Sequence, residues 1–441
     1  GIISDKATDD ATTSSSSDKK TAVAPSALTK RLSEGTHSLL PNPSDLKTQG
    51  IAAYAQGDYA QAIASLEAAL KENRNDPEAF IYLNNARIGD QAAHTLAAIA
   101  PVGTTSEIGL ELLRGVGQAQ QDLNQLIGDN GIPIKILLAN DDNDPNLAKS
   151  IATELVNRSE VLGVLGHYSS GVTLEAAPVY DQGKLPMVSA VSTSVELSGF
   201  SPYVFRTVPS DSFAAAALAR HMIDGLNAKK AVLYYDSNSA YSLSLKSEFT
   251  TSVFSDGGEV MTEYDLADES LDAEQQIALA KSRGADVIML ASSTDTLEPS
   301  FDVMAAVNQE LPLLGGDDLY HPRVLKEGAT DAEGLVVAVP WHVLSDPESQ
   351  FVTGSRQLWG ADVSWRTAMA YDAIASLGAA VITAPSREGI RTALQEANFS
   401  ADGATGDVHF LPSGDRNRAA QLVQIQPGNR SGLGFDFIPI D

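Results

Sequence analysis

The sequence predicts an α/β protein with two doubly wound parallel-sheet lobes, joined by a multi-strand hinge and preceded by a small α-helical hairpin. Three observations predict this architecture. From about residue 95 onward, short β-branched and aliphatic runs alternate with longer amphipathic runs, a pattern typical of parallel sheets covered by helices on both faces. These runs form two series of about four or five strands each, which indicates two lobes. Ahead of them, small and apolar residues recur at helical spacing over residues 46–88.

The first series contains four expected strands. They are Leu96–Val102, Ile134–Ala139, Val161–Leu165 and Pro186–Ala190. Helical patterns between them include Glu107–Leu126 and Pro145–Val156. The second of these helices is expected to begin with Asp144 as N-cap and Pro145 at the first helical position, where the missing N–H of proline costs nothing.

The second series contains five expected strands. They are Ala231–Tyr235, Glu259–Tyr264, Val287–Ala291, Leu311–Gly315 and Leu335–Val339, and the helical patterns around them are Phe213–Leu226, Tyr241–Phe254 and Ala273–Arg283. We assign residues 94–207 and 340–406 to the first lobe and residues 208–339 and 407–441 to the second. Ligands of doubly wound sheets bind outside the carboxyl ends of the strands, so we expect the binding site between the lobes.

Residues 1–44 are rich in Ser, Thr, Asp, Lys and Ala and poor in large apolar side chains. A segment of this composition buries too little apolar surface to fold, so we expect a disordered linker. The sequence begins with Gly and shows no signal-peptide pattern. We therefore expect that a signal or anchor has been removed and that the linker tethers the folded part to a membrane. The alternative is a disordered terminus without a tethering role.

Residues 45–93 are expected to form a helical hairpin. The turn Gly57-Asp58 separates two amphipathic helices, and Asp76-Pro77 starts a third. The run QGDYAQAIASLEAALKENRNDPEAFIYL resembles one tetratricopeptide repeat, with Gly57, Tyr59, Ala62, Leu66, Ala69 and Pro77 at matching positions. A single repeat needs a neighbour to bury its exposed face, so we expect it to pack on the main domain or on a protein partner. The alternative is a plain helical hairpin without a partner role.

Composition excludes several classes of function. The formal net charge of −27 and the pI of about 4.5 disfavour binding to nucleic acid or to anionic lipid. Cysteine is absent, so a thiolate metal site and a cysteine nucleophile are excluded. The seven histidines show no metal-ligand spacing, and no nucleophile–base pattern is evident. We therefore expect no catalytic site, no metal and no cofactor.

From about Ala97 to the C-terminus the chain resembles the leucine/isoleucine/valine-type binding proteins of ABC transporters. The matching segments are AAIAPVGTTSEIGLELLRGVGQA, IKILLANDDNDPNLAKSIATELV, VLGVLGHYSSGVTLEAAPVYDQGKLPMVSAVSTSVEL, ADVIMLASSTDT, LPLLGGDDLY, EGLVVAVPW, TAMAYDAIASL and GDVHFLPSGDRN. The third is the most specific, because both ligand-binding turns of the family lie in it. The resemblance implies the type I periplasmic-binding fold, whose lobes close around a ligand.

The resemblance also implies ligand-binding residues in the first lobe. Ser170 lies at a helix start beside Ser169, and in the family its equivalent holds the ligand's α-carboxylate through its hydroxyl and backbone amide. Helix N-termini suit a carboxylate because their N–H groups are unpaired and the dipole is positive there. By the same resemblance, the Val191 carbonyl faces the ligand's ammonium group and the Thr193 hydroxyl bonds ligand polar atoms.

In the second lobe, the resemblance places Asp317 against the α-ammonium group and Tyr241 as a ring that caps the pocket. We expect further walls from Tyr168, Tyr320 and Trp341. The loop PVGTTSEIG departs from the family because it lacks the usual Ser-Gly pair, and Ile108 stands where some members have an aromatic side chain. These departures leave the residues for the α-groups in place and put the side-chain preference in doubt.

The resemblance implies a periplasmic or extracytoplasmic, monomeric solute-binding protein that captures a free amino acid for an ABC permease. An aliphatic amino acid is expected first, because no Arg or Lys in the matched turns could pair with a second carboxylate. The alternative is a ligand-sensing or partner-binding regulatory protein that recruits a partner through its helical repeat. Retention of Ser170, Thr193 and Asp317 favours transport.

Overall fold

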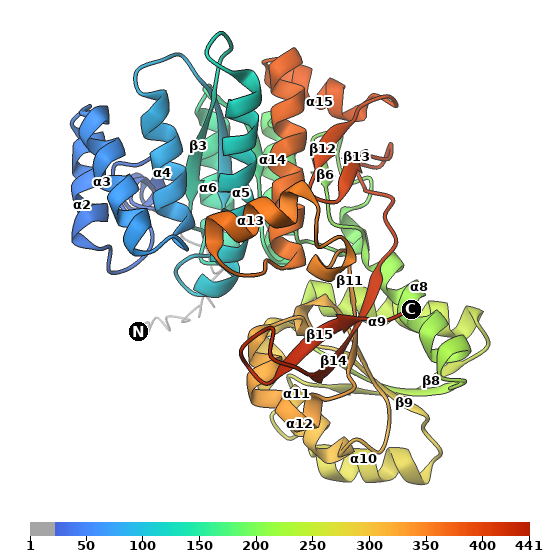
Figure 1. Ribbon diagram of the computed structural model, residues 1–441. Helices are drawn as coiled ribbons and strands as arrows, with labels where there is room; N and C mark the ends of the chain where they lie inside the picture. Colours follow the sequence, from blue (N-terminus) through green and yellow to red (C-terminus); the bar gives the residue numbers. More distant parts are fainter. Residues whose placement is uncertain (1–22) are drawn as a thin grey trace, which may run out of the picture.

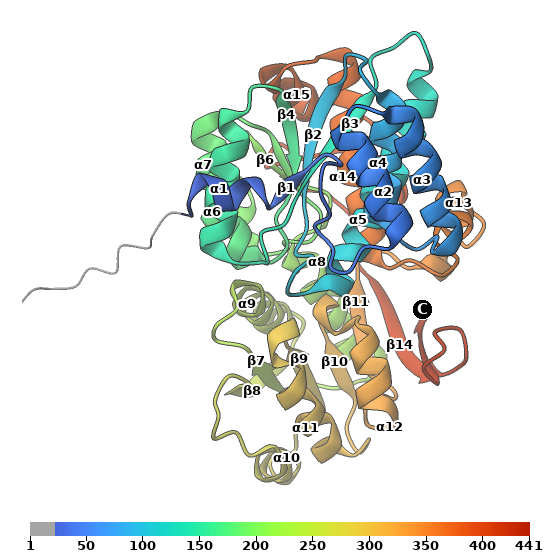
Figure 2. The same ribbon diagram turned by 90° about the vertical axis from the view of Figure 1, so that its left-hand side faces the viewer.

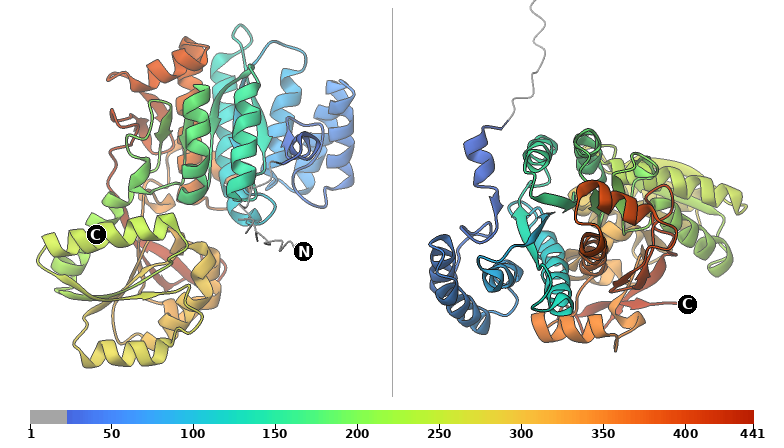
Figure 3. Two further views of the ribbon diagram at one scale, coloured as in Figure 1. Left: turned by 180° about the vertical axis from the view of Figure 1, so that it is seen from behind. Right: turned by 90° about the horizontal axis from the view of Figure 1, so that it is seen from above.

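Two α/β lobes with a helical unit beside the first of them make up the computed structural model, which describes residues 23–441 (Figure 1). The predicted fold class is confirmed. Each lobe is built on one sheet with mainly parallel strands, and helices cover both faces (Figure 1). Figures 2 and 3 show the helical unit (blue) against the side of the first lobe, away from the second lobe.

The first lobe contains a sheet with the strand order β1-β3-β2-β4-β5-β6. Its strands are β1 (Leu32–Ser33), β2 (His94–Ile99), β3 (Ile134–Ala139), β4 (Val161–Leu165), β5 (Met187–Ser189) and β6 (Val204–Arg206). Strands β2 to β6 are parallel, whereas β1 pairs antiparallel with β3. Its helices are α5 (Ser106–Ile127), α6 (Pro145–Asn157), α7 (Ser170–Gly183), α13 (Gln350–Trp359), α14 (Trp365–Thr383) and α15 (Arg387–Gln395).

The second lobe contains a sheet with the strand order β15-β14-β11-β10-β9-β7-β8. Its strands are β7 (Lys230–Tyr235), β8 (Glu259–Asp265), β9 (Val287–Ala291), β10 (Leu313–Gly315), β11 (Val336–Val339), β14 (Gln421–Pro427) and β15 (Phe435–Pro439). Strands β7 to β11 are parallel, and β14 and β15 add an antiparallel edge. Its helices are α8 (Asp211–Arg220), α9 (Ala240–Ser255), α10 (Ala273–Ser282), α11 (Leu297–Val307) and α12 (Ala329–Ala332).

Parallel strands buried on both faces are the elements that the sequence defines best. Strands β3, β4 and β9 have the predicted bounds, because near-continuous apolar runs mark fully buried strands. The predicted strand Leu96–Val102 starts and ends earlier as β2, since Pro101 has no N–H for a sheet hydrogen bond. Helix α6 begins as predicted: the Asp144 side chain accepts hydrogen bonds from the N–H groups of Asn146 and Leu147.

Residues 23–44 are folded, which corrects the prediction of a disordered linker over residues 1–44. They contain α1 (Pro25–Thr29) and β1, and the Arg31 guanidinium pairs with the Asp142 carboxylate at 2.9 Å. The Glu78 carboxylate accepts hydrogen bonds from the Ser38 hydroxyl and from the Leu39 N–H. The prediction was wrong because distant parts of the chain order this segment, which its own composition does not show. Residues 1–22 of the predicted linker lie outside the described residues.

The predicted hairpin region forms α2 (Asp45–Ala55), α3 (Tyr59–Glu72) and α4 (Pro77–Ile88). Of the two expected packing partners, the structure shows the main domain: α4 packs against α5 and β3. The Asn85 side chain donates to the Ile136 carbonyl at 2.8 Å and accepts from the Ile136 N–H at 3.1 Å. A protein partner for this unit, and its likeness to a tetratricopeptide repeat, stay predictions.

The chain passes between the lobes after β6, after β11 and before β14. The predicted boundary between residues 406 and 407 divides a hairpin of β12 (Ala401–Gly403) and β13 (Gly406–Val408), which pair with each other. Beyond this hairpin, Asp415 still pairs with Arg206 of the first lobe at 2.6 Å. Residues 407–415 therefore belong with the first lobe. Composition changes little at this crossing, so the sequence could not locate it.

The described helices include no single one that is long and apolar enough to cross a membrane. Only α14 and α15 together, as a pair bent by 113°, meet the length and composition required.

Candidate ligand-binding site

A cavity of about 280 Å³ lies between the two lobes at the carboxyl ends of their parallel strands. The first lobe contributes the loop after β4 and the first turn of α7, and the second lobe contributes the start of α9 and the loops after β9 and β10. Five of the predicted site residues line it: Tyr168, Ser169, Ser170, Val191 and Tyr241. This is the position that a doubly wound topology favours for a ligand, and we call it the first cavity.

Ser170 is placed to donate a hydrogen bond into the first cavity. It is 1 % exposed, and its hydroxyl oxygen accepts hydrogen bonds from the N–H groups of Thr193 and Ser194, both at 3.1 Å. With its oxygen occupied as acceptor, the hydroxyl proton remains to be donated. The first N–H groups of α7 have no intrahelical acceptor, and the Ser169 side chain makes no capping hydrogen bond to them. These donors suit an anion.

Two further hydroxyl groups beside the first cavity have no hydrogen-bond partner among residues 23–441. They belong to Tyr168 and Thr193, and both side chains are buried. Buried polar groups are normally satisfied, and leaving one unpaired costs about 1–3 kcal/mol. A polar ligand would satisfy both hydroxyls.

The second lobe brings Tyr241 and Asp317 together. The Tyr241 hydroxyl accepts a hydrogen bond from the Asp318 N–H at 3.4 Å and helps to hold down the pKa of the Asp317 carboxyl, which burial raises. At Gly316 the chain passes so close to the Tyr241 ring that an added Cβ atom would meet the hydroxyl oxygen. Gly316 is therefore required for this approach of the β10 loop to α9.

Asp211, at the start of α8, adds a carboxylate that sequence reasoning did not include in the site. It is 1 % exposed, and its Oδ2 atom has no partner among the described residues. Burial, followed by the negative charge of the nearby Asp317, raises the pKa of this carboxyl to about 7. Burial, followed by the negative charge of Asp317, also raises the pKa of Asp318.

Arg366 is the buried cation beside these carboxylates. Its Nη1 atom donates to the Tyr320 carbonyl at 2.9 Å and pairs with Glu111 at 3.3 Å, and its Nη2 atom donates to the Asp317 carbonyl. Glu111 offsets the charge of Arg366, so the carboxyl groups of Asp211, Asp317 and Asp318 leave this region with an excess of acidic groups over cations. Buried carboxylates favour a ligand with a positive group, because such a group stabilises their charged form.

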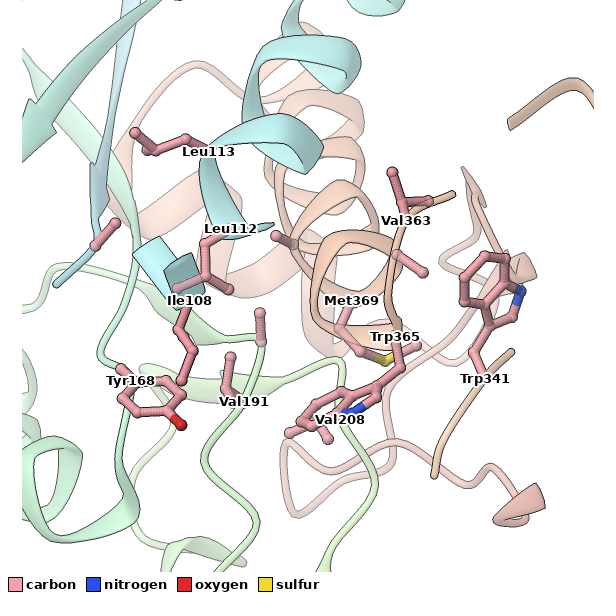
Figure 4. Close-up of a cluster of buried hydrophobic side chains, with 14 of the residues drawn as sticks. Ile108, Leu112, Leu113, Tyr168, Val191, Val208, Trp341, Val363, Trp365 and Met369 are labelled. Carbon is pink, nitrogen blue, oxygen red and sulfur yellow. The ribbon is translucent and has the colours of Figure 1, made fainter. Parts of the chain in front are cut away.

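Four predicted site residues do not line the first cavity: Thr193 and Asp317, which lie beside it, and Tyr320 and Trp341, which were expected as walls. Tyr320 stacks on Phe437 with ring centroids 4.2 Å apart. Trp341 packs edge-on against Phe351 at 5.6 Å, and in Figure 4 it lies on the far side of a buried cluster from Tyr168. That cluster also contains Ile108, Val191 and Trp365. Both residues follow strand ends, but the Tyr320 ring points toward β15 and the Trp341 ring points toward α13, away from the first cavity.

The residues that sequence reasoning missed gave weak signals. Asp211 follows Ser210 at a helix start, where an acidic residue is ordinary. Arg366 offered more, because it and Asp372 are the two charged residues of a largely apolar helical run, WRTAMAYDAIASL. A charge in such a run indicates a buried and paired group.

The pKa shifts predict how stability depends on pH. The carboxyl groups of Asp211, Asp317 and Asp318 have raised pKa values in the folded protein, above the value of about 3.9 expected in the unfolded chain. The folded state therefore binds more protons than the unfolded state between about pH 4 and pH 8, so these groups lower the free energy of unfolding as pH rises. Urea unfolding of ligand-free protein at several pH values measures this slope. Asp211→Asn is expected to make the slope shallower, and an unchanged slope would contradict the assignment.

Comparisons with known proteins agree with this geometry. A family model described as periplasmic binding protein matches residues 94–431. The chain is 30 % identical over 136 residues to an amino acid binding protein of Pseudomonas aeruginosa, covering 30 % of this chain and 36 % of that protein. It is 22 % identical over 247 residues to the Leu/Ile/Val-binding protein of Escherichia coli K12, covering 54 % and 65 %. The match thus spans about a third of the first relative and just under two thirds of the second.

Solved structures show the same fold. An ABC transporter substrate-binding protein from Desulfitobacterium hafniense in complex with Leu matches with a TM-score of 0.68 and 22 % identity, over 78 % of this chain and 99 % of that chain. The family is one of binding proteins, in agreement with the expectation that this chain is not an enzyme. Because the family model covers most of the sequence, the chain belongs to the periplasmic binding protein family.

Proposed function

We propose that the chain captures a free α-amino acid between its lobes outside the cytoplasm and passes it to an ABC permease. One observation supports this most: the unpaired hydroxyls of Tyr168 and Thr193 on the first lobe lie near the buried carboxylates of Asp211, Asp317 and Asp318. An α-amino acid has one carboxylate and one ammonium group on the same carbon. Its carboxylate would accept hydrogen bonds from the first-lobe donors while its ammonium group pairs with the buried carboxylates.

The α-carboxylate is assigned to the start of α7. There the Ser170 hydroxyl has a proton to donate, and the first N–H groups of the helix face the same space. The Thr193 hydroxyl, which has no partner among the described residues, is a further donor. Charge-assisted hydrogen bonds to a carboxylate are shorter and roughly twice as strong as neutral ones.

The α-ammonium group is assigned to Asp317, with the Val191 carbonyl as a second acceptor. An ammonium group beside Asp317 would lower the raised pKa of that carboxyl and keep it charged. Asp317 comes from the second lobe and Ser170 from the first, so only the closed form places both on one ligand. Closure also joins the lobes directly, because the Val195 N–H donates to the Ser244 hydroxyl at 3.0 Å.

An aliphatic side chain is proposed for the ligand. Of the residues labelled in the buried cluster of Figure 4, Tyr168 and Val191 line the first cavity, and apolar pocket walls favour apolar groups. The relatives support the same class, since one is a Leu/Ile/Val-binding protein and one solved relative is a complex with Leu.

A thermal-shift screen tests the proposal. The protein is unfolded, stripped of bound ligand, refolded and mixed with each of the twenty amino acids, and with the keto and hydroxy acids that match leucine. A ligand at about 100 times its Kd adds about 2.7 kcal/mol to the free energy of unfolding, so we expect a clear rise in Tm with leucine, isoleucine or valine. Equal rises with the keto acid would contradict the role of Asp317. No rise with any amino acid would contradict the function.

A further inference from the structure

A second cavity of about 310 Å³ also lies between the lobes. It is lined by α5 and the segment before α14 on the first lobe, and by the loop after β10 and the β14–β15 turn on the second. Among the described residues, none lines both this cavity and the first one. Fully buried Arg366 lies between them, donating to the Asp317 carbonyl near the first cavity and to the Tyr320 carbonyl beside the second.

One wall of the second cavity is aromatic. The Tyr320 ring stacks on Phe437 with an interplanar angle of 26°, and His342 meets Tyr320 edge-on at 5.7 Å. Burial lowers the pKa of His342 to about 4 and that of His321, which also lines the cavity, to about 4. Both imidazoles are therefore neutral at physiological pH. An uncharged aromatic wall of this kind favours a planar ring, which stacks on it or meets it edge-on.

Among residues 23–441, the charges that line the second cavity leave one cation, Arg114, without an ionic partner. The Asp362 carboxylate pairs with Arg430 and Arg356, the Asp436 carboxylate accepts two backbone N–H groups, and Glu111 pairs with Arg366.

Arg114, in contrast, forms no ion pair within residues 23–441. Its Nε atom donates to the Asn75 side chain at 2.8 Å, and burial lowers the pKa of its guanidinium. The Glu111 carboxylate, whose charge acts on Arg114, is already paired with Arg366. An arginine fork with free N–H groups fits a carboxylate in a bidentate way.

We infer that the second cavity is a separate site for a small aromatic carboxylate, with the carboxylate on Arg114 and the ring against Tyr320 and Phe437. The volume is near the lower end of the range for ligand pockets, which fits a single-ring acid. Because both lobes line the cavity, its ligand binds the closed form better than the open form and shifts the lobes toward closure.

Benzoate, with benzamide as its uncharged match, tests this site on the full chain. We expect benzoate to bind at up to a few millimolar in ligand-observed NMR and calorimetry, and benzamide not to bind. Arg114→Gln keeps a donor for Asn75 but removes the charge, and is expected to weaken benzoate binding about ten- to a hundredfold. Arg283→Gln, a change at an exposed arginine of the second lobe, is expected to leave benzoate binding unchanged.

Two further measurements separate the second cavity from the first. Ser170→Ala, a change in the first cavity, is expected to leave benzoate binding in place. Cooperative urea unfolding of Ser170→Ala and Arg114→Gln is expected to show that both variants fold, with a lower midpoint for Ser170→Ala because the Thr193 and Ser194 N–H groups lose their acceptor. Benzoate binding that is absent, or that persists undiminished in Arg114→Gln, would overturn the inference. Loss of benzoate binding in Ser170→Ala alone would place that acid in the first cavity and overturn it equally.

Discussion

Replacing Asp317 with Asn is expected to weaken amino acid binding by about a hundredfold or more. The substitution keeps the size of the side chain and one acceptor oxygen, so the cavity keeps its shape. It removes the negative charge that we assign to the ligand's ammonium group, which is then desolvated without an ionic partner. Truncating one partner of a buried, hydrogen-bonded charge pair costs about 2–5 kcal/mol, most of it as faster dissociation. Calorimetry and stopped-flow kinetics with leucine measure both effects.

A matched control separates the effect of the Asp317 charge from that of the overall negative charge of the protein. Asp256→Asn removes a carboxylate from an exposed position after α9, and we expect no change in affinity from it. The hydroxy acid that corresponds to leucine lacks the ammonium group, so Asp317→Asn is expected to change its affinity little. An equal loss of affinity for leucine and for the hydroxy acid would show that Asp317 acts through the shape of the cavity and not through its charge.

The fold was predictable because its main determinant is local in the sequence. Buried parallel strands appear as unbroken apolar runs, and runs such as Val287–Ala291 have the same bounds in the structure as in the prediction. The segment 23–44 was not predictable in this way. Its β1 strand pairs with β3, more than a hundred residues later, and its loop is bound by Glu78. Contacts over such distances leave no pattern in the composition of the segment itself.

The candidate site was predictable where a residue directly follows a strand end. The family resemblance placed Ser170 and Val191 in the turns that follow two strands, and both line the first cavity. Tyr320 also follows a strand end, yet its ring turns toward Phe437 and the second cavity. Strand ends fix the position of the backbone, whereas the direction of a long side chain depends on neighbours from other parts of the chain. Asp211 shows the same limit, since the chain crossing after β6 and a hydrogen bond from its N–H to the Thr193 carbonyl bring it to the site.

Replacing Glu78 with Ala is expected to destabilise the N-terminal helical unit by about 3–5 kcal/mol. Glu78 is fully buried, and its carboxylate pairs with the Lys47 ammonium group at 2.9 Å. It also accepts hydrogen bonds from the Ser38 hydroxyl and the Leu39 N–H at 2.6 and 2.7 Å. Removing it leaves a buried ammonium group with Asp76 as its remaining carboxylate, and it releases the loop that leads from β1 to α2.

Hydrogen exchange resolves this effect by region. We expect faster exchange over residues 34–92 in Glu78→Ala, because the loop before α2 loses its hydrogen bonds to α4. The exchange of the strands in both lobes is expected to stay unchanged. Glu67→Ala, in the same unit, breaks only a half-exposed pair with Arg87 and is expected to change stability by less than about 1 kcal/mol. If both variants exchange alike, apolar packing of α4 on α5 holds the unit and Glu78 adds nothing. If the lobes also exchange faster in Glu78→Ala, the unit is part of their cooperative core, which the pairing of Asn85 with β3 would explain.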